Sequence, residues 1–88
     1  MVTVDIYTRP FCSYCQRALR LLHEKQADVN EINAGMDKSK RAEMIQRANG
    51  ASTYPQIFIG DYHVGGSDDL HALEAAGKLD ALLQGETA

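Results

Sequence analysis

The feature that most constrains this chain is a pair of cysteines, Cys12 and Cys15, the only two among its 88 residues. Apolar and polar residues alternate over residues 2–7, just before the pair, and this alternation predicts a β-strand. A helix is predicted directly after it, running to about residue 25, because apolar residues recur at helical spacing: Cys15, Ala18, Leu19 and Leu22. A Cys-x-x-Cys sequence at a strand-to-helix junction is typical of a redox-active dithiol.

The place of the pair at a helix start predicts different roles for the two thiols. The first turn of a helix leaves backbone N–H groups unpaired and has a partial positive charge, and both stabilise an anion. A thiolate at Cys12 would lie against those N–H groups, so we expect its pKa to fall from about 8.5 into a range of roughly 3.5–7.5. Cys15 lies one turn along the helix and faces inward, which suits a resolving thiol better than an attacking one.

Other uses of the pair remain open but are less favoured. A zinc site normally has four ligands, whereas the chain has no second cysteine pair, and its three histidines (His23, His63 and His71) show no ligand spacing. A structural disulfide across so short a loop would constrain the unfolded chain only slightly. The surroundings of the pair therefore favour redox chemistry over a metal site, an inert disulfide or a purely structural domain.

Length and charge narrow the class of protein. We expect a single domain over residues 1–88, with a flexible tail over about residues 85–88. A net charge of −3 gives no basic field for nucleic acid. The chain has no run of 18 apolar residues, which a membrane-spanning helix would need. Its first residues lack the basic region and apolar stretch of a signal peptide. We therefore expect a cytoplasmic protein with reactive thiols in a reducing environment.

The middle of the chain predicts more strands and a second helix. A weak strand over residues 29–33 should pair in parallel with the first through a right-handed crossover. Asp37 is expected to cap a helix that ends at Asn49-Gly50. Residues 53–59 and 62–64 are expected to form a hairpin, with Pro55 near the start of its first strand.

The last third of the chain predicts a helix and one further turn. Ser67 is expected to cap this helix, Gly77 to end it, and its apolar stripe to consist of Leu70, Leu73 and Ala76. A short helical turn should follow over residues 79–83. The predicted order is β-α-β-α-β-β-α, an α/β domain in which ligands gather at the carboxyl ends of the parallel strands.

Three motifs in this order resemble the dithiol glutaredoxins, most closely the short bacterial glutaredoxin 3 type. They are TRPFCSYC over residues 8–15, TYPQIFI over residues 53–59 and GGSDDL over residues 65–70, and the resemblance covers essentially the whole chain. It implies a thioredoxin-like fold, with a four-stranded mixed sheet flanked by helices. It also implies a glutathione-dependent thiol–disulfide oxidoreductase that reduces protein–glutathione mixed disulfides and protein disulfides, as a monomer.

The resemblance also implies roles for single residues. Cys12 would be the nucleophile, Cys15 the resolving thiol, and the peptide bond before Pro55 cis. The expected glutathione-binding residues are Arg9, Tyr14, Thr53, Tyr54, Pro55, Gln56, Gly66, Ser67 and Asp68.

Each part of glutathione has expected partners among these residues. The Tyr54 backbone would pair with the cysteinyl part. Gly66 and Ser67 N–H groups would hold the γ-glutamyl end, with Asp68 on its ammonium. The glycyl carboxylate would face Arg9, with Gln56 nearby, and Tyr14 would line the groove. Plainer roles stay open for three of them: Arg9 as a loop arginine, Asp68 as a first-turn helix residue, and Tyr14 as packing.

Two departures from the family pattern bear on function. Ser13 stands where proline is commonest, and some family members without that proline hold a [2Fe–2S] cluster between two subunits, ligated by the nucleophilic cysteine and glutathione. A cluster-bridged dimer ligated by Cys12, acting as a cluster carrier or sensor, is therefore an alternative. Tyr54 stands where valine is usual, and its bulk would narrow the groove. A redoxin served by thioredoxin reductase is the other alternative, against which the Gly65–Asp68 motif argues.

Overall fold

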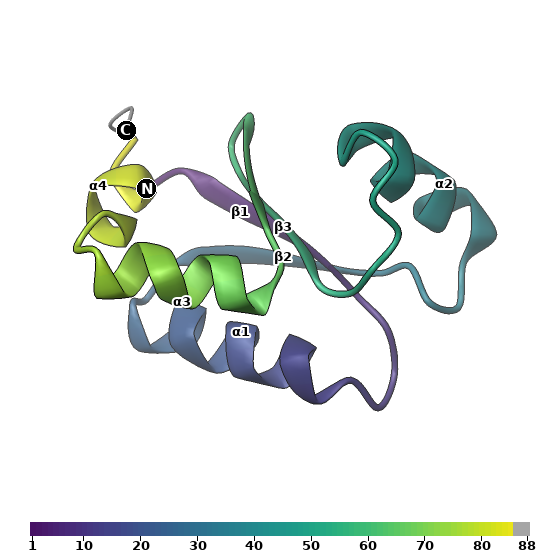
Figure 1. Ribbon diagram of the computed structural model, residues 1–88, viewed down its shortest axis with the longest axis horizontal. Helices are drawn as coiled ribbons and strands as arrows, with labels where there is room; N and C mark the ends of the chain where they lie inside the picture. Colours follow the sequence, from purple (N-terminus) through teal and green to yellow (C-terminus); the bar gives the residue numbers. More distant parts are fainter. Residues whose placement is uncertain (86–88) are drawn as a thin grey trace.

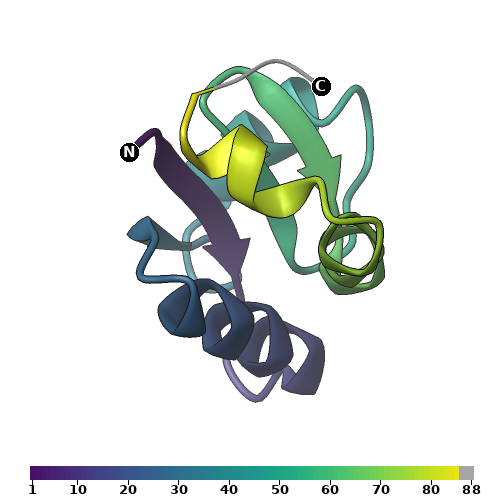
Figure 2. The same cartoon turned by 90° about the vertical axis from the view of Figure 1, so that its left-hand side faces the viewer.

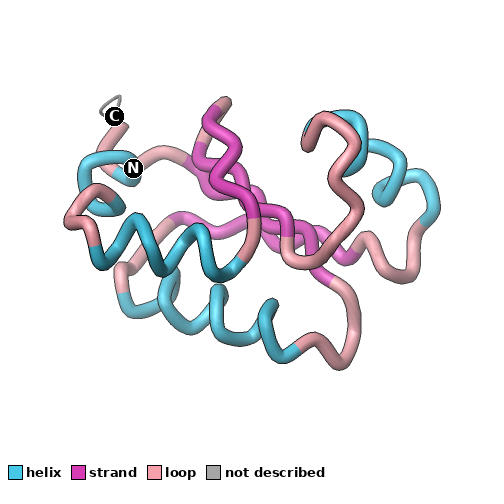
Figure 3. Tube along the Cα trace, viewed as in Figure 1, coloured by secondary structure: helices cyan, strands magenta, loops and turns pink. Residues whose placement is uncertain are grey.

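The computed structural model describes residues 1–85, which form four strands and four helices (Figures 1 and 3). In chain order these are β1 (Thr3–Thr8), α1 (Ser13–Glu24), β2 (Asp28–Asn33), α2 (Lys38–Arg47), β3 (Gln56–Ile59), β4 (Tyr62–Gly65), α3 (Ser67–Ala75) and α4 (Leu79–Leu83). The predicted order of elements is confirmed, and the expected last helical turn is α4. None of the helices in residues 1–85 combines the length and apolar character needed to cross a bilayer.

The four strands form one mixed sheet in the order β2-β1-β3-β4. β1 pairs in parallel with β2, as the helical crossover between them predicts, and antiparallel with β3. β3 and β4 form the predicted antiparallel hairpin. The polar strand β2 lies at an edge of the sheet, while β1, with the cysteine pair after it, lies inside.

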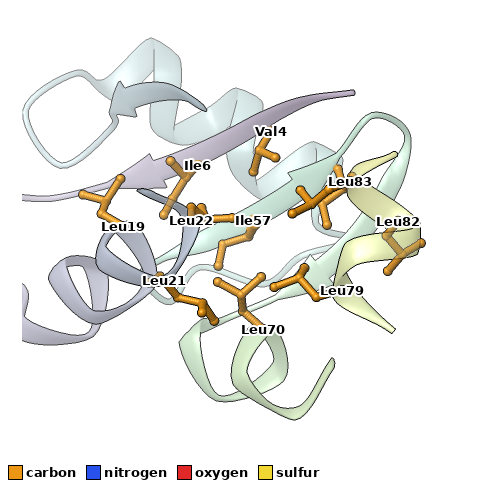
Figure 4. Packing of buried hydrophobic residues seen from close by; sticks show 12 residues of the cluster. Val4, Ile6, Leu19, Leu21, Leu22, Ile57, Leu70, Leu79, Leu82 and Leu83 are labelled. Carbon is orange, nitrogen blue, oxygen red and sulfur yellow. The ribbon is translucent and has the colours of Figure 1, made fainter. Parts of the chain in front are cut away.

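Helices cover both faces of this sheet. Figure 1 shows α1 and α3 on one side and α2 on the other, and α1 and α3 contact each other. The larger core cluster fills the α1–α3 side, where Val4, Ile6, Ile57 and Ile59 of the sheet meet leucines of α1, α3 and α4 (Figure 4). A second cluster faces α2 and consists of Tyr7, Ala34, Met44, Ala48 and Phe58.

The ends of α2 and the position of α4 follow from local hydrogen bonds. Asp37 Oδ1 accepts the N–H groups of Ser39 and Lys40 at 3.0 and 3.2 Å, which confirms the predicted cap. Past the other end of α2, Asn49 has a left-handed backbone with φ 55°. At the start of the chain, the Val2 N–H donates to the Leu83 carbonyl at 3.0 Å, so α4 lies beside the start of β1 (Figure 2).

The predicted cap of α3 is wrong by one residue. Gly66, not Ser67, is the N-cap, and the Asp69 carboxylate accepts the Gly66 N–H at 2.9 Å. Gly65 has a φ of 110°, and a Cβ there would collide with the Asp69 carboxylate. The hydrogen bond between Gly66 and Asp69, which occupies the space that a side chain at Gly65 would fill, marks the start of the helix.

Three other expectations need correction or completion. The first hairpin strand begins at Gln56 rather than at residue 53, since Pro55 has no N–H to donate to a ladder. Ala76 is exposed, so the apolar stripe of α3 rests on Leu70 and Leu73. Gly85, expected in a flexible tail, donates its N–H to the Leu82 carbonyl at 3.1 Å, and residues 86–88 lie outside the described residues.

We predict that Leu70→Ala destabilises the fold by roughly 2–5 kcal/mol, because Leu70 is fully buried in the larger core cluster. Urea unfolding followed by circular dichroism measures the change. Leu73→Ala, on the same helix but half-buried, is the matched control with a smaller expected loss. Equal losses for the two variants would contradict the assignment of Leu70 as the residue that anchors α3.

Candidate active site

The loop between β1 and α1 places Cys12 at the start of α1. Cys12 is the N-cap residue, with an extended backbone (φ −107°, ψ 108°), and its Sγ accepts the Cys15 N–H at 3.3 Å. Its thiol therefore takes the place that a Ser or Asp oxygen takes in an ordinary N-cap. Both cysteines are free thiols, with Cys12 4% and Cys15 0% exposed.

Opposing effects act on the Cys12 thiol, and the net result is a lowered pKa. Burial is the largest single effect and raises the pKa, because it disfavours the charged thiolate. It is outweighed by hydrogen bonds from the Cys15 side chain and N–H, the positive charge of Arg9, and a hydrogen bond from the Tyr14 N–H. The lowering predicted from the helix start is confirmed in direction, and Arg9 adds to it.

The Cys15 thiol has the opposite character. Burial, followed by its hydrogen bond to Cys12, raises the pKa of Cys15 to about 12. Cys15 therefore stays a protonated donor at neutral pH, while the lowered pKa of Cys12 favours the negative charge on that sulfur. These opposite shifts in pKa fit the predicted roles of Cys12 as nucleophile and Cys15 as resolving thiol.

The segment before Cys12 is fixed by the loop after β2. The Thr8 carbonyl accepts the N–H groups of Ala34 and Gly35, at 2.9 and 3.2 Å. Gly35 packs so closely that an added Cβ would overlap Arg9 Cβ and lie 2.9 Å from Arg9 Cα. Phe11, directly before the nucleophile, is fully exposed and has a left-handed backbone with φ 58°. The chain thus turns sharply between a fixed Arg9 and the start of α1.

A groove of about 430 Å³ lies beside the first turn of α1, where Tyr14 lines it. Its lining includes eight of the residues predicted for glutathione: Tyr14, Thr53, Tyr54, Pro55, Gln56, Gly66, Ser67 and Asp68. The ninth, Arg9, lies at its edge, with its guanidinium carbon 6.0 Å from the centroid of the Tyr54 ring. Three distant parts of the sequence therefore meet at one groove.

The loop before β3 forms one wall of the groove. The Tyr54–Pro55 peptide bond is cis. Gln56 is only 3% exposed, and its side-chain amide forms hydrogen bonds at both ends. Its Nε2 donates to the Thr53 carbonyl and to Thr53 Oγ1, each at 3.0 Å. Its Oε1 lies 2.8 Å from His63 Nε2, and since Oε1 can only accept, that nitrogen is the donor. These hydrogen bonds of Gln56 thus fix the conformation of the loop before β3.

The start of α3 forms the facing wall. The Gly66 N–H, expected to be offered to a ligand, instead donates to the Asp69 carboxylate. The Ser67 hydroxyl is buried and has no hydrogen-bond partner among the described residues. Asp68 lines the groove and is exposed.

Comparison with known proteins identifies the family. The glutaredoxin family model matches residues 4–64. The chain is 55% identical over 83 residues to a glutaredoxin of Pseudomonas aeruginosa, which covers 94% of this chain and 98% of that protein. The chain belongs to the glutaredoxin family. It is also 49% identical to Escherichia coli glutaredoxin 3 over 84 residues, 96% of this chain and 100% of that protein, which confirms the predicted resemblance.

Solved glutaredoxins share its fold. The solution structure of a glutaredoxin from Brucella melitensis has a TM-score of 0.83 at 56% identity, covering 100% of this chain and 96% of that one. The crystal structure of a buckwheat glutaredoxin–glutathione complex has a TM-score of 0.83 at 28% identity, covering 97% and 81%. The thioredoxin-like fold is confirmed, and the chain is a thiol–disulfide oxidoreductase with its CxxC pair at Cys12 and Cys15.

Sequence reasoning missed three residues that shape this glutaredoxin's groove: Gly35, His63 and Asp69. His63 was set aside because it has no ligand spacing, yet the hairpin register pairs it with Phe58, on whose ring it stacks at 4.6 Å. Since Gln56 and Phe58 are two residues apart on one strand, they share a face, and this alternation was a usable signal for His63. Gly35 had no such signal, because its contact with Arg9 arises only in space.

We predict that Cys15→Ala moves the pH profile of Cys12 alkylation by iodoacetamide upward, because it removes the side-chain hydrogen bond that lowers the Cys12 pKa. Cys15→Ser, which keeps a donor, should move it less. The measurement is the alkylation rate between pH 5 and pH 10, with circular dichroism to confirm folding. Identical profiles for wild type and Cys15→Ala would show that Cys15 does not stabilise the thiolate.

Proposed function

We propose that this glutaredoxin uses glutathione as its reductant and binds it in the groove beside Cys12. The supporting observation is that a thiol with a lowered pKa begins the helix whose Tyr14 lines the groove, and that this groove has a cation, Arg9, at the Tyr54 side and a carboxylate, Asp68, at the α3 side. Glutathione has carboxylates at both ends and an ammonium at one, so its charges suit such a groove. A buckwheat glutaredoxin of the same fold forms a complex with glutathione.

The ligand contacts that we propose are those that the family resemblance implies, and the lining of the groove supports them. Arg9 is the partner for the glycyl carboxylate through charge-assisted hydrogen bonds. The first N–H groups of α3, at Ser67 and Asp68, face the γ-glutamyl carboxylate, since the Gly66 N–H is already bonded to Asp69. Asp68 meets the ammonium, the Tyr54 backbone pairs with the cysteinyl part, and Tyr14, Thr53 and Pro55 line the groove. Gln56 supports Thr53 rather than touching the ligand.

The reaction begins on a protein–glutathione mixed disulfide. The Cys12 thiolate attacks the glutathione sulfur, the sulfur–sulfur bond to the protein breaks, and the protein leaves as a thiolate that takes up a proton. A second glutathione, as thiolate, then attacks the glutathione sulfur on Cys12, which releases glutathione disulfide and restores the Cys12 thiolate. Because this cycle consumes reduced glutathione, we place the protein in the reducing cytosol.

Cys15 provides the route for protein disulfides. Burial is the largest cause of its high pKa, and the hydrogen bond with Cys12 and the charge of Cys12 raise that pKa further. Both are lost once Cys12 is in a mixed disulfide, so the Cys15 pKa falls at the stage when Cys15 must attack. Cys15 then attacks Cys12 Sγ, the bound thiol leaves, and an intramolecular disulfide forms that two glutathiones reduce.

We predict that Cys12→Ser abolishes enzyme-dependent reduction of a glutathione mixed disulfide, whereas Cys15→Ser retains it. The monothiol route needs only the attacking thiolate, and Cys15 serves only the intramolecular disulfide. The assay couples glutathione and glutathione reductase to oxidation of the nicotinamide cofactor. A folded wild-type protein with no glutathione-coupled turnover, but with turnover driven by thioredoxin reductase, would replace this proposal with the redoxin alternative.

Iron–sulfur binding is the second candidate function, and Ser13 in place of proline is the observation that favours it. Within residues 1–85 no group of three or more His, Cys, Asp or Glu side chains could hold a metal ion. The family resemblance implies that a cluster would lie between two subunits, ligated by Cys12 of each subunit and by glutathione.

We predict visible absorbance and a dimer after anaerobic reconstitution with iron, sulfide and glutathione if this function exists. Both should be lost with Cys12→Ser, with Ser13→Pro, or without glutathione. Size-exclusion chromatography with absorbance detection measures them together. A colourless monomer from wild-type protein would remove the cluster function and leave the oxidoreductase unaffected.

A further inference from the structure

Arg9 has a fixed backbone and an exposed side chain. The loop after β2 fixes the backbone, because Thr8 binds Ala34 and Gly35 and Gly35 packs against Arg9 Cα. The side chain is exposed, and the ion pairs found within residues 1–85 do not include it. A long arginine on the surface samples many rotamers unless something holds its guanidinium.

The Tyr54 ring is the contact that holds it. The Arg9 guanidinium carbon lies over this ring, 6.0 Å from its centroid, within the range of a cation–π contact. The ring is itself fixed, since Tyr54 is half-buried and packs against the cluster that contains Tyr7 and Phe58. On its other side the chain is anchored by the hydrogen bonds from Gln56 to Thr53.

The Tyr54 hydroxyl contributes nothing visible to this arrangement. It is buried and has no hydrogen-bond partner among the described residues. A buried, unpartnered hydroxyl costs free energy rather than supplying it. The useful part of Tyr54 in the unliganded protein is therefore its aromatic face, which an aliphatic residue such as valine would not offer.

We propose, building on the glutathione site assigned above, that Tyr54 is a positioning residue whose ring holds the Arg9 guanidinium at the edge of the groove. The charge that receives the ligand's glycyl carboxylate is thereby placed before the ligand arrives. Tyr54 thus makes the groove selective for a peptide thiol with a free carboxylate at that end. Preorganising a charged group lowers the entropic cost of binding.

Four variants test this coupling: Tyr54→Val, Arg9→Gln, the double variant, and Tyr54→Phe. A cation–π contact at an exposed site is worth roughly two- to fivefold in an equilibrium, so Tyr54→Val should raise the KM for glutathione by about that factor with little change in kcat. In the Arg9→Gln background the same change should have no further effect, since the cation is already gone. Tyr54→Phe, which keeps the ring, should raise KM by less than half as much.

Two controls separate positioning from a general structural role. Glutathione esterified at its glycyl carboxylate removes the group that Arg9 would bind, so Tyr54→Val should change its KM far less than that of glutathione. Tyr62→Val makes the same substitution on β4, outside the groove, and should leave the KM for glutathione unchanged.

Three results would overturn the proposal. Additive effects of Tyr54→Val and Arg9→Gln would show that the two side chains act independently. Equal effects of Tyr54→Phe and Tyr54→Val would assign the role to the hydroxyl. Equal effects on glutathione and its ester would show that the carboxylate is not involved.

A readout without glutathione distinguishes failure of this proposal from failure of the glutathione site. Arg9 also lowers the Cys12 pKa through its charge, so Arg9→Gln should move the alkylation profile of Cys12 upward. Tyr54→Val should move it in the same direction by less, and should add nothing to Arg9→Gln. If the two substitutions are coupled in the alkylation assay but the protein has no glutathione turnover, the Arg9–Tyr54 contact is supported and the glutathione site is contradicted. If they are coupled in neither assay, the contact itself is contradicted.

Discussion

The hydrogen bond from the Cys15 N–H to Cys12 Sγ joins the fold of this glutaredoxin to its chemistry. It is a helix cap in which sulfur replaces oxygen, and it lies where the backbone offers unpaired N–H groups and positive partial charge. Burial alone would raise the Cys12 pKa, and it is the strongest single effect on that thiol. The thiolate is favoured only because several donors and the Arg9 charge converge on one sulfur, and those donors depend on α1 beginning at Ser13.

The rest of the structure brings three segments of the chain together near Cys12. The larger core cluster packs α1 and α3 against one face of the sheet, and the second cluster packs α2 against the other face. As a result the first turn of α1, the loop before β3 and the start of α3 meet along one groove, with Arg9 at its edge. Three local contacts then fix these segments. Gly35 packs against Arg9, His63 donates a hydrogen bond to Gln56, and the Asp69 carboxylate accepts the Gly66 N–H.

Local patterns predicted most of this architecture, and contacts between distant residues account for what they missed. The strands, the Asp37 cap and the direction of the Cys12 pKa shift follow from alternation, helical spacing and position at a helix start. The cis peptide bond before Pro55 was predicted only from the family resemblance, because composition does not determine it. Ser67 was a reasonable cap by residue type, but the N-cap is one residue earlier, at Gly66, whose N–H donates to the Asp69 carboxylate. Neither Gly35 nor the fixed end of Arg9 has any signature in the local sequence.

The most direct test of this account is a ¹³C NMR titration of the two cysteine Cβ atoms in reduced wild-type protein. The account predicts that Cys12 titrates below the ordinary thiol range, while Cys15 stays protonated throughout that range, consistent with its pKa of about 12. The two thiols should thus be separated by several pH units. Titration of both near an ordinary pKa of about 8.5, or of Cys15 before Cys12, would contradict it.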